Sequence, residues 1–175
     1  GVSDGVGITA SAGSFETNGL ELSINYFPID EVDMDFSLTT QNTKDTREGM
    51  DNITPANSPK LLAYFNVNYE LLSTLSVNLS ARYVSKMKSE WHFAASNPEG
   101  SRVGAGSGAY SLFDISSIWK IYSAKNNKAG LDLRFGIYNL LDKVYKAPSH
   151  SEIIWADKGI PADGRSFQLG AVYNF

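Results

Sequence analysis

The stretch Leu61-Leu-Ala-Tyr-Phe-Asn-Val-Asn-Tyr-Glu-Leu-Leu-Ser-Thr-Leu-Ser-Val-Asn-Leu-Ser-Ala-Arg-Tyr83 decides the fold class of this chain. Every second residue on each side of Ser73-Thr74 is apolar, and polar residues, often asparagine or serine, fill most positions between them. Side chains on a strand point alternately to the two faces of a sheet. The period of two therefore predicts a hairpin of two long strands with one apolar face.

The same alternation recurs along the chain and predicts seven strands. They lie near residues 8–27, 32–44, 60–71, 74–88, 109–122, 130–140 and 164–175. Runs of about 10–14 residues exceed the usual length of strands in soluble sheets and suffice for a tilted strand to span a membrane. Val6–Phe15 is either the beginning of one very long first strand or a separate short strand, which would make eight.

The alternation fits two architectures, and the connections separate them. A soluble sandwich turns its apolar face inward, whereas an outer-membrane barrel turns it toward lipid and its polar face toward a wet lumen. Such barrels have short turns at one end and long loops at the other. Short and long connections alternate here: the short ones are Pro28–Glu31, Leu72–Thr74 and Ser123–Ala129, and the long ones are Asp45–Pro59, Ser89–Gly108 and Leu141–Asp163.

Aromatic residues gather at both ends of the expected strands. Those near the short connections or the final residue are Tyr26, Phe27, Tyr69, Trp119, Tyr122, Tyr173 and Phe175. Those toward the long connections are Tyr83, Trp91, Tyr110 and Tyr138. Two aromatic belts are typical of barrels at the two membrane interfaces. We therefore expect an all-β, antiparallel transmembrane barrel, with a soluble β-sandwich binding module as a weaker alternative.

Composition excludes several functions. The 175 residues carry 15 Lys plus Arg against 19 Asp plus Glu, a net charge of -4 without a basic run, so no nucleic-acid partner is expected. The absence of Cys excludes disulfides and thiolate chemistry. The first residues do not read as a signal peptide. No catalytic triad or acid–base pair is legible, so an enzyme and a bound cofactor are not expected.

The number of predicted strands indicates whether they can close a barrel by themselves. A closed bacterial barrel normally has an even number of strands, and seven strands leave two edges that lipid would not tolerate. The chain is thus expected to form part of a larger barrel. If Val6–Phe15 forms an eighth strand, a small self-contained barrel, acting as a passive pore or adhesin, becomes the alternative.

Candidate chemistry lies in the long connections. His92 and His150 are the two histidines of the chain, and with Trp91, Phe93 and Trp155 they form the expected ligand-binding set, able to cap a haem or a metal chelate. Two ordinary loop histidines remain the alternative, and no metal ligands are identified. Gly104, Gly106 and Gly108 mimic a phosphate loop but precede a strand, which favours a flexible loop. Asp33 and Asp35 share a strand face and are expected to line a wet lumen.

A set of motifs one strand apart carries a family resemblance. The motifs are Tyr110-Ser-Leu-Phe-Asp-Ile115, Tyr138-Asn-Leu-Leu-Asp-Lys143 followed by Tyr145, Gly164-Arg165-Ser-Phe-Gln-Leu-Gly170, and the final Phe175. In their order and spacing they resemble the C-terminal part of the barrel of TonB-dependent outer-membrane receptors. The residues that carry the resemblance are Asp114, Asn139, Asp142, Tyr145, Gly164 and Arg165.

The resemblance implies an architecture and a set of partners. The family barrel has about 22 strands around a plug, so residues 1–175 would supply its C-terminal seven strands and the plug would lie elsewhere. It implies active uptake of a scarce nutrient such as an iron–siderophore, haem or another metal complex, driven by the TonB–ExbB–ExbD complex. Tyr173 and Phe175 resemble the signal for membrane assembly. The chain would lie in outer-membrane lipid with its C-terminus in the periplasm.

Overall fold

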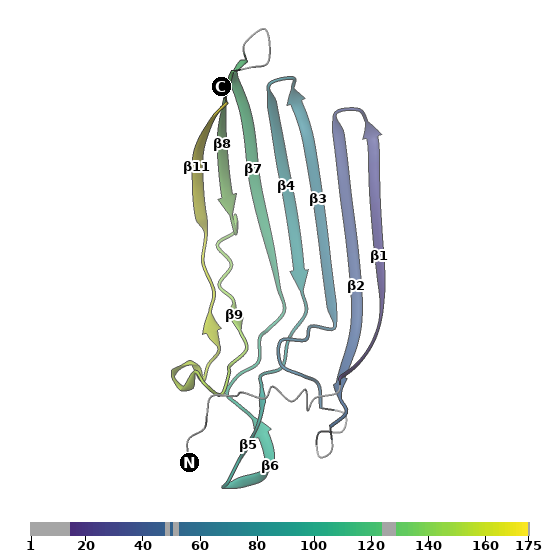
Figure 1. Ribbon diagram of the computed structural model, residues 1–175, viewed down its shortest axis with the longest axis vertical. Helices are drawn as coiled ribbons and strands as arrows, with labels where there is room; N and C mark the ends of the chain where they lie inside the picture. The colour runs from purple at the N-terminus through teal and green to yellow at the C-terminus, as the bar shows by residue number, and fades with distance from the viewer. Residues whose placement is uncertain (1–14, 48–49, 51–52, 124–128, 175) are drawn as a thin grey trace, which may run out of the picture.

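A computed structural model describes residues 15–47, 50, 53–123 and 129–174. Seven long strands form one antiparallel sheet in the order β1-β2-β3-β4-β7-β8-β11 (Figure 1). Their bounds are β1 Phe15–Ile29, β2 Val32–Asp45, β3 Leu61–Leu72, β4 Leu75–Val84, β7 Tyr110–Ser123, β8 Gly130–Tyr138 and β11 Ser166–Asn174. The prediction of seven long antiparallel strands is confirmed. Residues 6–14, which the sequence left between two interpretations, lie outside the described residues.

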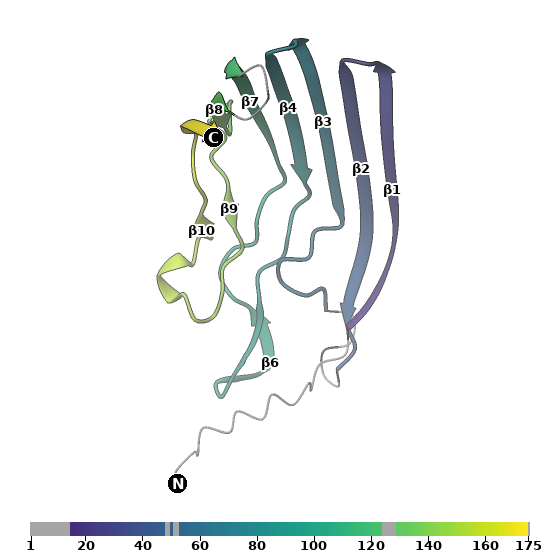
Figure 2. The ribbon, with the colours of Figure 1, turned by 45° about the horizontal axis from the view of Figure 1, so that its top comes forward.

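The long connections gather at one end of the sheet, here called the long-loop end (Figures 1 and 2). They contain small elements that the alternation did not predict. These are the hairpin of β5 Trp91–Ala94 with β6 Asn97–Arg102, the pair β9 Lys146–Ala147 with β10 Ile160–Pro161, and the 3-10 helix η1 Ile154–Ala156. Chain segments far apart in sequence therefore meet there, while the connections described at the opposite end, between β1 and β2 and between β3 and β4, are short.

Strand register places apolar residues in line across the whole sheet. One row crosses all seven strands and consists of Tyr26, Met34, Val67, Leu79, Ile115, Ile137 and Phe167. The adjacent row on the other face is polar and begins Asn25, Asp35, Asn66, Ser80 and Asp114. Because neighbouring residues of a strand face opposite ways, the sheet has one apolar and one polar face, as the sequence predicts.

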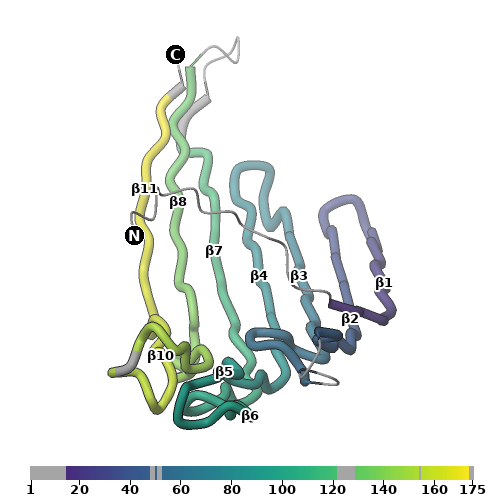
Figure 3. The backbone as a smooth tube through the Cα atoms, turned by 60° about the horizontal axis from the view of Figure 1, so that its bottom comes forward, coloured from purple at the N-terminus to yellow at the C-terminus, as the bar shows by residue number. Residues whose placement is uncertain are grey.

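Within the described residues, no second layer covers the apolar face of the sheet. The tube in Figure 3 shows the long strands as a single layer. Leu79, Phe135 and Leu169 on this face are 49, 43 and 74 % exposed. The buried apolar residues of the described chain, Met50, Val84, Leu112 and Ala156, lie instead at the long-loop end or in its loops. The described residues therefore contain neither a sandwich nor a dry interior between sheets.

Three irregularities interrupt the ladders near the short-connection end. One shifts the pairing between Lys120 and Tyr122, so that Tyr122 rather than Ile121 becomes the partner of Leu131. The others lie between Tyr26 and Ile29 and between Glu70 and Leu72. Bulges of this kind commonly lie at the rims of barrels. Separately, β4 ends at Val84, four residues before its predicted end. No helix in the described part of the chain is long and apolar enough to cross a membrane.

Candidate functional site

A ladder of amide and carboxylate side chains crosses the polar face of β1 to β4. Asn25 donates a hydrogen bond from Nδ2 to Oδ1 of Asp35. Asn66 donates to the other oxygen of Asp35 at 3.3 Å, and Asn78 donates to Oδ1 of Asn66 at 2.8 Å. Among the described residues, the buried Oδ1 of Asp33 has no hydrogen-bond partner. A face of this composition suits water or a polar partner and not hydrocarbon.

The motif residues of the resemblance meet at the long-loop ends of β7, β8 and β11. Asn139 is buried and has a φ of 52°, a left-handed conformation that asparagine tolerates better than most residues. Its backbone N–H donates to Oδ1 of Asp114 at 2.7 Å. Its side chain donates to the carbonyl of Lys143 at 3.0 Å and accepts from the Lys143 N–H at 2.8 Å. Asn139 thus holds the turn after β8 against β7.

Asp142 connects the same turn to β11. It also has a positive φ, of 51°, and its Oδ1 accepts from the Arg165 N–H at 2.9 Å, while the Arg165 guanidinium lies 3.8 Å from its other oxygen. A β-carbon on Gly164 would lie 3.1 Å from Oδ1 of Asp142. Tyr145 stacks on Tyr110, with ring centroids 4.4 Å apart. Asp114, Asn139, Asp142 and Arg165 are thus linked by hydrogen bonds at these strand ends, with Gly164 and the Tyr110–Tyr145 ring pair beside them.

A buried serine joins two of the long connections. Ser149 donates from Oγ to the Ala156 carbonyl at 2.6 Å and accepts from the N–H groups of Ala105 and Gly159, both at 3.1 Å. Gly104 lies against it with a φ of 55°, and a β-carbon there would lie 2.6 Å from Ser149 Oγ. The glycines therefore do not precede a phosphate-binding helix. Gly104 is required for close packing, which revises its interpretation as a residue of a flexible loop.

Arg102 joins the β5–β6 hairpin to the long connection between β2 and β3. Its guanidinium donates to the carbonyl of Ser89 and, at 2.7 Å, to that of Thr54, and it lies 5.4 Å from the Trp91 ring centroid. Burial lowers the pKa of Arg102, although a guanidinium stays protonated at neutral pH. Gly100, with a φ of 76°, makes room for the rings of Trp91 and Phe93. Hydrogen bonds and packing thus connect all three long connections.

The two histidines approach one carboxylate. His150 Nδ1 lies 3.6 Å from Oε2 of Glu90, which accepts from the Ser151 N–H at 2.7 Å. Burial raises the pKa of Glu90, but the Ser151 hydrogen bonds and the nearby His150 and His92 hold that pKa below its ordinary value overall. His150 Nδ1 also accepts from the Glu152 N–H at 3.2 Å. Glu90 therefore connects the two larger long connections through its contacts with Ser151 and His150.

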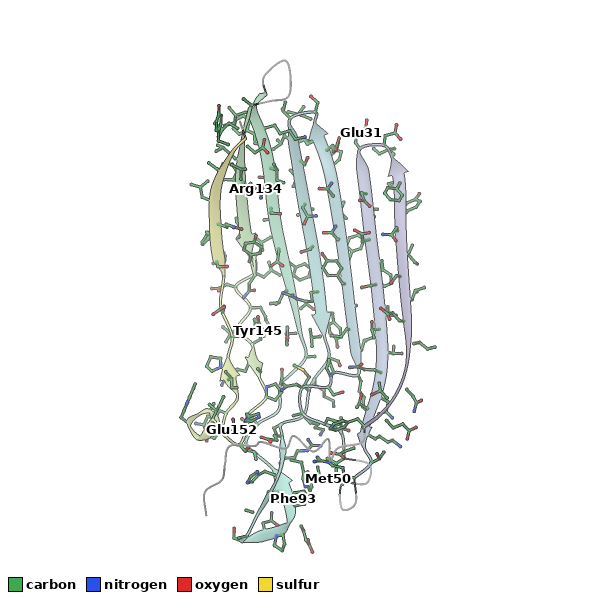
Figure 4. All side chains as sticks on the ribbon, in the orientation of Figure 1. Glu31, Met50, Phe93, Arg134, Tyr145 and Glu152 are labelled. Atoms are coloured by element: carbon green, nitrogen blue, oxygen red, sulfur yellow. The ribbon has the colours of Figure 1, made fainter. Side chains whose placement is uncertain are left out.

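The expected ligand-binding residues are spread over both larger long connections. Trp91, His92 and Phe93 form part of β5, and Trp155 lies on η1 and is 73 % exposed. Figure 4 shows Phe93 beyond the strand ends at the long-loop end, with Glu31 at the opposite end. In the described ranges, no group of three or more His, Asp or Glu residues is placed to hold a metal ion.

Sequence reasoning missed Glu90, Arg102 and Ser149, which hold the loops together. A single Glu, Arg or Ser in an irregular segment gives no periodic signal, so only the folded loops show their partners. Two residues were expected to form the signal for membrane assembly. Tyr173 is 59 % exposed and is paired with Leu131 at the short-connection end of the sheet. Phe175 lies outside the described residues.

Solved structures with a similar arrangement of strands include receptors for iron complexes. The siderophore receptor PiuA from Acinetobacter baumannii is 21 % identical with a TM-score of 0.66, and the match covers 93 % of this chain and 22 % of that one. The ferric-catecholate import receptor Fiu from Escherichia coli K12 is 19 % identical with a TM-score of 0.66, covering 91 and 21 %. The ferripyoverdine receptor of Pseudomonas aeruginosa is 18 % identical with a TM-score of 0.66, covering 92 and 20 %.

The chain thus spans about a fifth of the length of these structures. No curated protein matches it in sequence. The family model described as TonB dependent receptor-like, beta-barrel matches residues 2–140, which is most of the chain. The seven-stranded sheet has the architecture of part of such a barrel, which has about 22 strands. The chain therefore belongs to the TonB-dependent receptor β-barrel family.

Proposed function

We propose that this chain is the C-terminal part of the barrel of an outer-membrane receptor that actively takes up a scarce iron complex. The observation that carries the proposal is the row from Tyr26 to Phe167, an apolar line across seven strands in a chain whose family match covers residues 2–140. An apolar row of this extent suits contact with lipid. The three structures described above are named for siderophore, ferric-catecholate and ferripyoverdine recognition.

We propose that the polar face of the sheet contacts a partner inside the barrel. Asn25, Asp35, Asn66 and Asn78 present amide and carboxylate groups from four neighbouring strands. Such groups are well suited to hydrogen bonds with a plug domain of the same protein or with lumenal water. In this proposal the plug is displaced by force from the TonB–ExbB–ExbD complex. The short connections and the C-terminus then face the periplasm.

The long-loop end gives the proposed ligand surface. Phe93 is 44 % and Trp155 73 % exposed, and His92 is also exposed, so these side chains are available to an aromatic or metal-chelating ligand. Trp91 contacts Arg102 and His150 contacts Glu90, so both are proposed to shape this surface more than to bind metal directly. The connected loops would present these groups as one body.

A small self-contained barrel is the second candidate. In the described residues, β1 and β11 are each paired on one side only, which supports a larger barrel. The two candidates differ in their energy requirement, because a passive pore works without TonB whereas a receptor needs it.

The test is uptake of radioactive iron by cells that express the intact protein in a strain lacking its own iron receptors. Iron complexes of catecholate, hydroxamate and citrate type are supplied in turn. We expect saturable uptake of one class that disappears on deletion of TonB. Uptake that persists without TonB supports a passive pore, and absence of uptake for every class contradicts the proposal for iron. In a cell with uptake, Phe93→Ala and Trp155→Ala should weaken binding at the surface.

A further inference from the structure

Two large apolar residues lie in the turn that follows β8. Leu141 and Val144 are 68 and 82 % exposed, although each lies next to a residue that the turn holds firmly. Asn139 and Asp142 fix this turn to β7 and β11. The exposed side chains are therefore displayed from an ordered turn, and exposed apolar groups of this kind often mark a contact surface.

A groove of about 360 Å³ runs from this turn onto the apolar face of the sheet. Leu141 and Lys143 form its part in the turn, and Tyr83 and Phe113 form its part on the sheet. Both aromatic residues belong to the apolar face. Phe113 on β7 lies two residues from Ile115 of the apolar row, and Tyr83 on β4 lies four residues from Leu79 of the same row. The groove is thus continuous with the face that the proposed function assigns to lipid.

A second groove, of about 300 Å³, adjoins the first and shares Ala109, Tyr110 and Lys143 with it. Its other residues in the turn are Val144, Tyr145 and Lys146. Lys146 also donates from Nζ to the Lys158 carbonyl at 3.2 Å. The two grooves together form a surface with an apolar part along the sheet and a lysine-rich part beyond the strand ends.

The charge of this surface selects an anionic occupant. Asp142 is the carboxylate of the turn, and it accepts from the Arg165 N–H and lies near the Arg165 guanidinium. Lys143 and Lys146 therefore add positive charge that Asp142 does not balance. Lysines beside apolar grooves at a membrane interface favour phosphate-bearing headgroups, while their stems cover the apolar part.

We propose that this surface binds one phosphorylated lipid of the outer leaflet. Its phosphate lies against Lys143 and Lys146, and an acyl chain follows Leu141, Phe113 and Tyr83 down the sheet. The inference rests on the proposed membrane placement and goes beyond it, since it assigns a defined lipid site to one turn. It requires both parts of the surface, because the lysines provide charge and the groove provides chain contact.

The test uses the intact receptor in nanodiscs of equal parts phosphatidylglycerol and phosphatidylcholine. After extraction into mild detergent, native mass spectrometry counts the phosphatidylglycerol molecules that remain bound. We expect the wild type to retain phosphatidylglycerol in preference to phosphatidylcholine, and Lys143→Gln to reduce the retained fraction about fivefold. Leu141→Gln, which changes an exposed side chain, should also reduce it. Lys158→Gln, a lysine of the neighbouring loop outside both grooves, is the matched control and should leave it unchanged.

Three results overturn the inference: equal retention by Lys143→Gln and the wild type, equal retention of the two lipids, or displacement of phosphatidylglycerol by inorganic phosphate. Release by phosphate alone would mean that the lysines bind a free anion without the groove. Heat-modifiable migration on gels verifies that each variant is folded. If Lys143→Gln does not fold, the lipid retained by Leu141→Gln decides the test. Iron uptake by each variant is measured in parallel. A variant that retains less phosphatidylglycerol but takes up iron normally shows that the lipid site and the proposed uptake function can be tested separately.

Discussion

The Asp114 carboxylate on β7 accepts a hydrogen bond from the backbone N–H of Asn139, with 2.7 Å between Oδ1 and N. Asn139 is the residue after β8, and it is held in a left-handed conformation. One carboxylate therefore fixes the place where the chain leaves the sheet and enters a long connection. Asn139 and Asp142, two of the residues on which the resemblance rests, hold this turn through hydrogen bonds to Lys143 and Arg165.

Replacing Asp114 should loosen this turn. Asp114→Leu removes the acceptor of a partly buried N–H, and we expect a loss of about 2 kcal/mol in the free energy of unfolding. Asp114→Asn keeps an oxygen acceptor of the same shape and should lose less than half of that. Urea unfolding of the intact barrel in lipid vesicles measures both variants. Equal losses for the two would show that the hydrogen bond is not the cause.

Gly104 should tolerate no side chain. Gly104→Ala places a β-carbon 2.5 Å from the Asp157 carbonyl and requires a positive φ, which costs about 1–2 kcal/mol in an alanine. We expect the contact of the loops through Ser149 to open, so that limited proteolysis cuts them faster. Gly108→Ala is the matched control, because nothing lies within 4 Å of a β-carbon there. Similar cleavage of both variants would contradict the packing role of Gly104.

The Glu90 contact should weaken in acid. Its pKa lies below the ordinary value of 4.5 in the folded loops, so its stabilisation is complete above the unfolded pKa and is lost as pH falls through the folded pKa. Protection of the Ser151 amide against hydrogen exchange, corrected for the intrinsic rate, should therefore hold at neutral pH and fall as the pH is lowered past 4.5 through the depressed pKa of Glu90. Glu90→Gln should remove this pH dependence. A variant with the same pH profile as the wild type would assign the effect to another group.

Neighbouring residues of β7 should respond oppositely to a charge. Ile115 lies in the apolar row and Ser116 on the polar face. Ile115→Lys should lower the free energy of unfolding by about 2–4 kcal/mol, because the charge enters hydrocarbon. Ser116→Lys should change it by less than about 1 kcal/mol. Folding into vesicles, followed by urea titration, gives both values, and a larger loss for Ser116→Lys would place lipid on the wrong face.

The long strands could be predicted from sequence because alternation repeats over many residues in each. The loops could not, because their order depends on single contacts. Ser149 carries no periodic signal, yet its hydroxyl joins Ala105, Ala156 and Gly159. Likewise, Arg102 anchors the hairpin β5–β6 by a hydrogen bond to the Thr54 carbonyl, and Gly100 leaves room for the rings of Trp91 and Phe93. The spacing of apolar residues predicts neither contact.

The candidate ligand residues were only partly predictable. The sequence drew attention to His92 and His150 as rare residues, but their relation to Glu90 depends on two connections about 60 residues apart meeting in space. The motifs that carry the resemblance, in contrast, could be read as a pattern from the sequence alone. The conformational demands at Asn139 and Asp142 became visible only from their positive φ angles.

The most direct measurement is the solvent around two successive residues of β4. The chain has no Cys, so Leu79→Cys and Ser80→Cys each introduce a single thiol into it for a spin label. Electron paramagnetic resonance of the intact protein in lipid vesicles compares collisions with oxygen, which dissolves in hydrocarbon, and with a water-soluble nickel complex. We predict more oxygen contact for the label at Leu79 and a more polar surrounding at Ser80. The reverse order, or equal shielding of the Leu79 label from both reagents, would contradict a lipid-facing apolar side.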